Sequence, residues 1–258
     1  MLDELYAGSL ADALRRRETV SLNQVESAAL SAAPALDAIE FLKPSDQIKI
    51  LAEVKRASPS KGQMAEIPDP ALLAEIYVSN GASAISVLTE ERKFKGSLDD
   101  LRAVRAKVSV PLLRKDFIAN EYQILEGRAA GADIILLIVA GLPEADIVRL
   151  KAFTEALGMT AFVETHSAEE LKIAAGVGAR MIGVNARDLS TFETDRDLFA
   201  KLVHLFPADA IKVAESAVRT AADVAHYRQA GADVALVGEA LVTNDPAEML
   251  KSFLQAGQ

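Results

Sequence analysis

The chain has 258 residues, half of them hydrophobic, so it is long enough to bury a large core. Its 28 basic and 37 acidic residues give a net charge of -9, which disfavours nucleic acid or a membrane surface as a general partner. It has no cysteine, which excludes disulfides, thiolate metal sites and a cysteine nucleophile. The apolar run at 134–142 is too short to cross a bilayer, and the acidic start does not resemble a leader. We therefore expect a cytoplasmic protein.

The first 47 residues differ from the rest of the chain, and apolar positions such as Leu5 and Leu10 predict one or two helices there. From about residue 48, short β-branched runs alternate with longer helical stretches, as in parallel βα units. We predict strands at 48–55, 84–89, 111–116, 134–138, 160–164, 181–185, 211–215 and 234–238. Eight strands is the number that closes a barrel.

The stretches between the strands carry helix signals. Asp69 and Asp245 each precede a proline, and Ser97, Ser167 and Thr220 begin capping boxes or acidic variants of them. Gly-Ala pairs at 81, 131, 178 and 231 each precede an even-numbered strand, which divides the chain into four similar quarters.

The predicted fold is α/β: a single (β/α)8 TIM barrel spanning residues 1–258, with 1–47 as a helical extension packed on the barrel. An open doubly wound sheet is the alternative. Such a sheet usually has a glycine-rich dinucleotide turn after its first strand, whereas this chain has Arg-Ala-Ser-Pro at 56–59. The closed barrel is therefore favoured.

The first predicted strand carries two ionisable side chains on one face, Glu53 and Lys55. Burying an acid beside a base removes both from water, which is costly in a purely structural strand. An exposed edge strand with an ion pair is the alternative.

Polar residues recur at the carboxyl ends of the other predicted strands, where barrel active sites lie. They are Lys115, Asp116, Glu164, Asn185, Arg187, Glu215 and Ser216. Lys55, Lys115 and Glu164 could surround one small ligand, and neighbouring carboxylates would tune which lysine is the better acid. Backbone N–H groups near Ser216, Ala217 and Gly238 are candidates for phosphate binding, although Gly238 could simply close a tight turn.

Glu-Val-Lys-Arg-Ala-Ser-Pro-Ser at 53–60 resembles the signature of the indole-3-glycerol phosphate synthase family. Further segments are similar to that family, in its order and spacing: 89–90 with 94–97, 113–117 with 122–124, 163–164, 183–189, 214–216 and 237–241. The resemblance extends from the first helix to the end of the chain.

The resemblance implies a carboxy-lyase of tryptophan biosynthesis that needs no cofactor. It would close 1-(o-carboxyphenylamino)-1-deoxyribulose 5-phosphate into indole-3-glycerol phosphate, with loss of carbon dioxide and water. By analogy, Lys115 is the acid, Lys55 holds the substrate's carboxylate or phosphate, and Glu164 is a base or steadies positive charge on nitrogen. Glu53 would orient the lysines, Asn185 would contact sugar hydroxyls, and Ser216 completes the catalytic set.

The resemblance also implies binding roles. Phe94, Phe117 and Pro59 would wall the pocket for the aromatic ring, although each could be ordinary packing. Ser58 and Arg187 are rim contacts, with Arg187 alternatively a loop tether. The remaining binding residues are Glu215, Ala217, Gly238 and Glu239. The expected partner is a phosphorylated aromatic amino-sugar, and the expected state a monomer or weak homo-oligomer.

One position departs from the family pattern: Ala217 follows Glu215-Ser216 where glycine is usual. If the backbone there has positive φ, alanine costs roughly 1 kcal/mol and its methyl crowds the anion. The histidines His166, His204 and His226 suggest no metal set or triad, and we treat them as solvated or structural.

Two other functions stay open. Phosphoribosylanthranilate isomerase would bind a related ligand, but such an isomerase commonly uses a cysteine, and this chain has none. A degenerate barrel that binds anions without turnover is the other.

Overall fold

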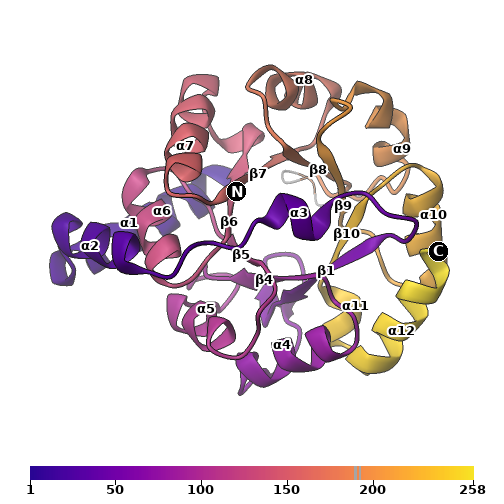
Figure 1. The fold of residues 1–258 in the computed structure, drawn as a ribbon, viewed down its shortest axis with the longest axis horizontal. Helices are drawn as coiled ribbons and strands as arrows, with labels where there is room; N and C mark the ends of the chain where they lie inside the picture. The colour runs from indigo at the N-terminus through magenta and orange to yellow at the C-terminus, as the bar shows by residue number, and fades with distance from the viewer. Residues whose placement is uncertain (189–190, 192) are drawn as a thin grey trace.

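The computed structural model describes residues 1–188, 191 and 193–258 and contains a closed barrel of parallel strands (Figure 1). In chain order the barrel strands are β1 (Lys49–Val54), β4 (Ala84–Leu88), β5 (Leu112–Lys115), β6 (Ile134–Ile138), β7 (Thr160–Thr165), β8 (Met181–Asn185), β9 (Ile211–Glu215) and β10 (Val234–Val237). Strand β10 pairs with β1 to close the ring. The predicted eight-strand barrel is confirmed, and no predicted strand boundary differs by more than one residue.

Helices surround the barrel (Figure 1). They are α4 (Pro70–Ser79), α5 (Leu98–Arg105), α6 (Glu121–Ala129), α7 (Glu144–Ala156), α8 (Ala168–Gly176), α9 (Leu198–Leu202), α10 (Ala221–Gln229) and α12 (Pro246–Ala256). Shorter elements are the hairpin β2 (Ala57–Ser58) with β3 (Gly62–Gln63), the turns η1 (Val139–Gly141) and η2 (Val203–Leu205), and α11 (Glu239–Val242). Within the described part of the chain, no helix could span a membrane.

The predicted helix caps are confirmed, although of the three predicted capping boxes only that of Thr220 is complete, and Ser97 and Ser167 make a single cap bond each. Asp69 and Asp245 cap α4 and α12, and Thr220 forms a capping box with Asp223. At the Gly-Ala pair before β6, Gly131 has φ +94°, and the N–H of Ala132 donates to the carbonyl of residue 127 at 2.9 Å. The other three pairs make the same backbone bond, so each turns the chain from a helix into the next strand.

The barrel interior changes from apolar to polar along the strands. Leu51, Leu113 and Phe162 are fully buried inside, in one apolar cluster. Two residues further along the same strands stand Glu53, Lys115 and Glu164, which alternation directs to the same side. Burial of one large apolar side chain contributes about 1.5–3 kcal/mol, so the lower layers support the charged upper one.

Three helices precede the barrel: α1 (Leu2–Thr19), α2 (Leu22–Ser31) and α3 (Ala38–Leu42). The prediction of one or two was wrong because α3 has only five residues, too few to show a helical period. The segment begins at the carboxyl ends of the strands, where Leu5 lines the pocket described below. It then passes α6, against which α2 packs, and α3 crosses the opposite end of the barrel (Figure 1).

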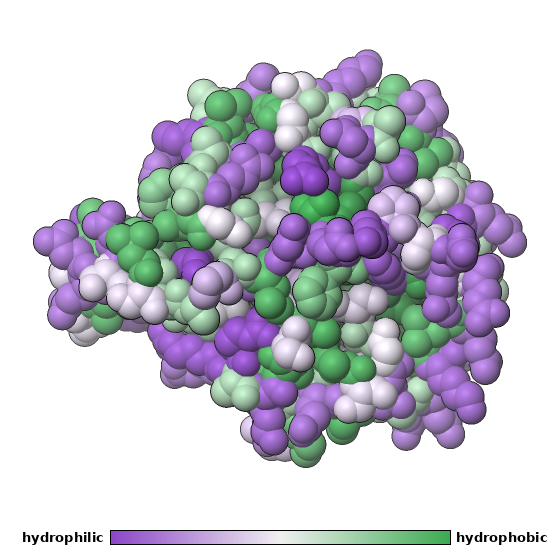
Figure 2. Space-filling view, viewed as in Figure 1, coloured by the Kyte–Doolittle hydropathy of each residue, from purple (hydrophilic) through white to green (hydrophobic). Residues whose placement is uncertain are grey.

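Helix α1 is fixed by buried polar contacts. Ser9 donates to Asp116 at 2.7 Å, and Arg16 makes two bonds to Glu126 at 2.6 and 2.9 Å. On the opposite face, which α3 crosses, hydrophilic side chains are interspersed with apolar patches (Figure 2). The N-terminal segment therefore touches both ends of the barrel.

Candidate active site

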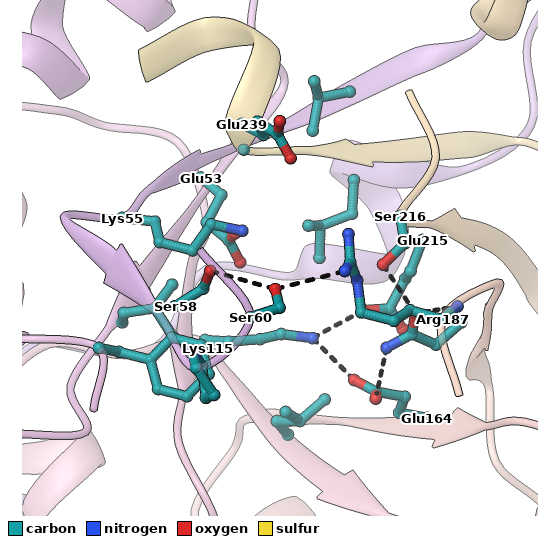
Figure 3. Close-up of a pocket in the computed structure, with 18 of the residues that line it drawn as sticks. Glu53, Lys55, Ser58, Ser60, Lys115, Glu164, Arg187, Glu215, Ser216 and Glu239 are labelled. Carbon is teal, nitrogen blue, oxygen red and sulfur yellow. Dashed lines mark hydrogen bonds and ion pairs between the residues drawn. The ribbon is translucent and has the colours of Figure 1, made fainter. Parts of the chain in front are cut away.

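A pocket of about 1250 Å³, including its open mouth, lies at the carboxyl ends of the strands (Figure 3). Every candidate residue named from the sequence lines it: Glu53, Lys55, Ser58, Pro59, Phe94, Lys115, Phe117, Glu164, Asn185, Arg187, Glu215, Ser216, Ala217, Gly238 and Glu239. The barrel thus brings together residues from all four quarters of the chain.

Lys115 occupies the centre of the charged layer. Its Nζ lies 2.7 Å from an oxygen of Glu164 and 2.7 Å from an oxygen of Glu215 (Figure 3). Burial works against the ammonium, yet Glu164, Glu215 and Glu53 together raise the pKa of Lys115 above its ordinary range. Lys115 is therefore a cation held by carboxylates and directed into the pocket.

Glu164 is buried and held from several sides. Besides Lys115, the Asn185 amide donates to its Oε1 at 2.9 Å, and Nε2 of His166 lies 3.3 Å from the same oxygen. Burial acts to raise the pKa of Glu164, but Lys115 and His166 hold it well below its usual range. Glu164 is thus ionised at neutral pH and placed to steady positive charge, although its low pKa makes it a weak base.

The pKa of Glu215 is shifted in the opposite direction to that of Glu164. Burial and the neighbouring Glu164 carboxylate raise the pKa of Glu215 to about 8, although Lys115 opposes the shift. A side chain at Gly183 would collide with Glu215 and with the ring of Phe162, so glycine makes room for this carboxyl group. At neutral pH the site therefore holds one ionised and one protonated carboxyl group on the same ammonium.

Glu53 and Lys55 form an ion pair of 2.7 Å in the same layer. Strand β1 pairs with β10 on one side and β4 on the other, and Glu53 is 3% exposed, so the alternative of an exposed edge strand is excluded. A side chain at Gly238 would overlap the Glu53 carboxylate and press on Lys55, which explains the glycine without any need for positive φ.

The end of the pocket opposite β5 is formed in part by the turn that follows β9. Ser216 and Ala217 both have positive φ, +68° and +59°, immediately after β9. The Ser216 hydroxyl donates to Asn185 at 2.7 Å, and Tyr227 donates to the Ser216 carbonyl at 3.2 Å. The left-handed conformation expected at Ala217 is present, so the methyl group does sit in a strained position.

Aromatic rings form the apolar wall. Phe94 and Phe117 lie 6.1 Å apart between ring centres, and Tyr6 of α1 meets Phe117 edge-on at 5.6 Å. Leu5, Leu136 and Ile138 extend this wall. Such a surface suits a flat aromatic ligand.

Polar contacts join the loops at the rim of the pocket. Arg187 donates to Ser60 at 3.4 Å, and Lys61 pairs with Glu239 at the start of α11. Leu189, the last residue of the 183–189 motif, lies outside the described residues.

Several residues at the site were not predicted to belong to it. Leu5, Met64 and Arg219 line the pocket, and His166 packs behind Glu164 although it is treated above as solvated or structural. The only local signal for His166 is its position two residues after Glu164, on the inward side. Docking of α1, which carries Leu5, depends on contacts far apart in sequence.

A closed eight-stranded barrel whose pocket, at the carboxyl ends of the strands, holds an ammonium between two carboxyl groups beside aromatic rings is typical of a TIM-barrel enzyme. Residues 2–253 match the family model described as indole-3-glycerol phosphate synthase. The chain belongs to the indole-3-glycerol phosphate synthase family.

Two relatives show how close the match is. The indole-3-glycerol phosphate synthase of Leifsonia xyli subsp. xyli is 59% identical over 98% of this chain and 97% of its own length. That of Arthrobacter sp. (strain FB24) is 52% identical over 100% of this chain and 96% of its own.

Among solved structures, 3-hexulose-6-phosphate synthase from Salmonella typhimurium is similar in fold, with a TM-score of 0.62. It is 17% identical and covers 81% of this chain and 98% of its own. Thiamine phosphate pyrophosphorylase from Pyrococcus furiosus has a TM-score of 0.60 at 13% identity, covering 82% and 95%. At these identities the likeness concerns the fold alone.

Proposed function

We propose that this carboxy-lyase of tryptophan biosynthesis closes 1-(o-carboxyphenylamino)-1-deoxyribulose 5-phosphate into indole-3-glycerol phosphate, releasing carbon dioxide and water. Membership of the family supports this reaction. The proposed mechanism rests on the contact of the Lys115 ammonium with Glu164 and Glu215, both at 2.7 Å.

Ring closure requires an acid at the sugar ketone. The ring carbon that bears the carboxylate is a weak nucleophile, so the carbonyl must be polarised while the new carbon–carbon bond forms. Lys115 hydrogen-bonds the carbonyl oxygen and transfers a proton to it. Loss of carbon dioxide then returns an electron pair to the ring and restores its aromaticity.

Dehydration completes the indole. Glu164 steadies the positive charge on nitrogen and accepts the proton lost as the second ring becomes unsaturated, while the former carbonyl oxygen leaves as water. Lys55, oriented by Glu53 at 2.7 Å, binds the substrate carboxylate or phosphate and assists this departure. Asn185 contacts the sugar hydroxyls, and Ser216 fixes Asn185 through their 2.7 Å bond.

Binding follows the two ends of the pocket. The aromatic ring lies against Phe94, Phe117 and Pro59, and the phosphate meets backbone N–H groups of the 216–217 and 238–239 segments. Ser58 and Arg187 contact the ligand from the rim, while Glu215 holds Lys115. The Glu239 carboxylate is kept off the anion by its pairing with Lys61.

One assay tests the function. The carboxyphenylamino-deoxyribulose phosphate is added to folded protein, and indole fluorescence is expected to rise, with one carbon dioxide released per indole. The Lys115→Met variant is the negative control. Absence of indole at substrate well above micromolar levels would refute the synthase function. Turnover of phosphoribosylanthranilate would favour the isomerase function. Binding of the substrate without turnover would favour the degenerate barrel that only binds anions.

We further propose that the enzyme works as a monomer or weak homo-oligomer in the cytoplasm. The proposed catalytic residues Lys55, Lys115 and Glu164 all come together within one chain, which supports a monomer as the working unit. A phosphorylated substrate does not cross a lipid bilayer unaided, which favours the compartment where it is made. Sedimentation at assay concentrations tests the oligomeric state.

A further inference from the structure

A histidine lies behind the carboxylate of the charged layer. His166 follows β7 two residues after Glu164, and its side chain is 11% exposed. It is not among the residues that line the pocket. Any influence on the reaction must therefore act through Glu164.

Both ring nitrogens of His166 face carboxylate oxygens. Nε2 lies 3.3 Å from Glu164 Oε1, a charge contact without the alignment of a hydrogen bond, and Nδ1 lies 3.2 Å from Glu170 Oε2. A neutral imidazole would direct a lone pair at one of these carboxylates, whereas the imidazolium presents N–H at both. The geometry therefore favours the charged ring.

The start of α8 holds the ring in place. The backbone N–H of His166 donates to Glu170 Oε2 at 2.7 Å, and the N–H of Glu170 donates to Ser167, which caps the helix, at 3.2 Å. Glu170 thus bonds both the backbone and the ring of His166. This arrangement links a helix terminus to the pocket carboxylate.

The other charges around this pair come from several elements. Lys115 of β5 contacts Glu164, Glu215 of β9 contacts Lys115, and Tyr6 of α1 lies near Glu164. The turn η1, which packs against α8, has no titratable side chain, and the turn η2, which also packs against α8, carries the exposed His204. With Glu215 protonated, Lys115 and His166 are two cations that balance the carboxylates of Glu164 and Glu170.

We propose that His166 is a positioning residue whose imidazolium keeps Glu164 ionised and fixes its direction toward the substrate. Although burial disfavours the imidazolium, Glu164 and Glu170 raise the pKa of His166 to about 10. Loss of this cation raises the pKa of Glu164. On acidification the carboxylate is then protonated at a higher pH than in the parent enzyme, and activity falls at that higher pH. The inference rests on the ring-closing function proposed above.

Kinetics of paired variants test this role. The His166→Gln variant keeps a hydrogen-bond donor without charge. We expect the acid limb of its pH–kcat profile to move to higher pH by about one unit, while kcat near pH 8 stays within about threefold of the parent. His166→Lys, which restores a cation, should return the limb toward its original position. His204→Gln changes an exposed histidine far from Glu164 in sequence and should leave the profile unchanged.

Titration of the histidine rings by NMR provides a readout that needs no turnover. The chain has three histidines, so the signals can be assigned by substitution. His166 should remain charged at about pH 8, and Glu170→Gln should lower its pKa and shift the kinetic limb less than His166→Gln does. The double variant should shift it no further than His166→Gln alone.

A His166 ring that titrates near the ordinary value of about 6.5 would overturn the proposal. An unchanged acid limb in His166→Gln would do the same. A parent enzyme that forms no indole contradicts the proposed function instead, and the NMR titration still decides whether the imidazolium exists.

Discussion

At the scale of single residues, Lys115 and Lys55 are both ammonium groups in one pocket, but their partners differ. Lys115 contacts two carboxyl groups, one on each of two strands, whereas Lys55 contacts only Glu53 among its described ion pairs. The first arrangement fixes a proton donor at the centre of the barrel. The second leaves an ammonium with one carboxylate partner, 19% exposed against 15% for Lys115, so that it can still take an anion as a second partner.

Replacement of each lysine by methionine should separate these roles. Lys115→Met should lower kcat by about 10²–10⁴-fold, the usual contribution of a general acid, while affinity for the product changes little. Lys55→Met should weaken product binding about tenfold as well, because it removes an anion contact. Fluorescence titration with indole-3-glycerol phosphate measures the affinities, and equal losses in both variants would contradict the division.

The raised pKa of Glu215 leads us to expect an alkaline limb in the pH–kcat profile. Its pKa of about 8 lies above the ordinary 4.5, so it is protonated at pH 7 and gains a negative charge as the pH rises through 8. That charge holds the Lys115 proton more tightly, so kcat should fall between about pH 7 and 9. Glu215→Gln mimics the protonated acid and should flatten this limb. A Gln variant with the parent's alkaline limb would refute the assignment.

The strained backbone at Ala217 leads us to expect tighter substrate binding when this residue is replaced by glycine. At φ +59°, glycine relieves roughly 1 kcal/mol of backbone strain and removes a methyl group beside the proposed phosphate site. Ala217→Gly should therefore lower KM and leave kcat nearly unchanged. Ala217→Val, with a branched side chain at the same φ, should raise KM. If KM is the same in all three proteins, the backbone strain does not reach the substrate.

At the scale of secondary structure, Arg16 anchors α1 of the N-terminal segment to α6 of the barrel. Its guanidinium is bound to Glu126, whose side chain is 5% exposed, so loss of Arg16 leaves a buried carboxylate poorly paired. We expect Arg16→Ala to cost about 1–3 kcal/mol, or roughly 3–8 °C in the thermal midpoint. Arg17→Ala, which removes an exposed neighbour on α1 that contacts the Tyr122 ring, at 5.9 Å from its centre, should cost less, at most about 1 kcal/mol. Equal midpoints for the two variants would contradict this docking role.

The elements also show how far local sequence patterns reach. Alternation and capping signals predicted every barrel strand because both depend on neighbouring residues, and the strand ends then defined the pocket. The helix α3 escaped prediction because five residues show no period. His166 and Leu5 escaped because their contacts, to Glu164 and the aromatic wall, arise only when distant elements dock.

At the scale of the whole molecule, the net charge is negative, whereas the pocket contains several positively charged side chains. The chain carries a net charge of -9, yet Lys55, Arg187 and Arg219 line the pocket. A protein of this overall sign does not attract anions from a distance, so selection for the substrate depends on the local cations and backbone donors. The N-terminal segment, which touches both ends of the barrel, adds an apolar contribution to the same pocket through Leu5.

Closure of the barrel by β1 and β10 sets the order in which the protein can be completed. Glu53 and Lys55 emerge early from the ribosome, but the strand that covers their free side is made last. At about 5–20 residues per second, synthesis of the chain takes roughly 13–50 s. For most of that time, from the synthesis of β1 to that of β10, one edge of β1 is open to wrong pairing, and the nascent chain must be protected there until its final quarter arrives.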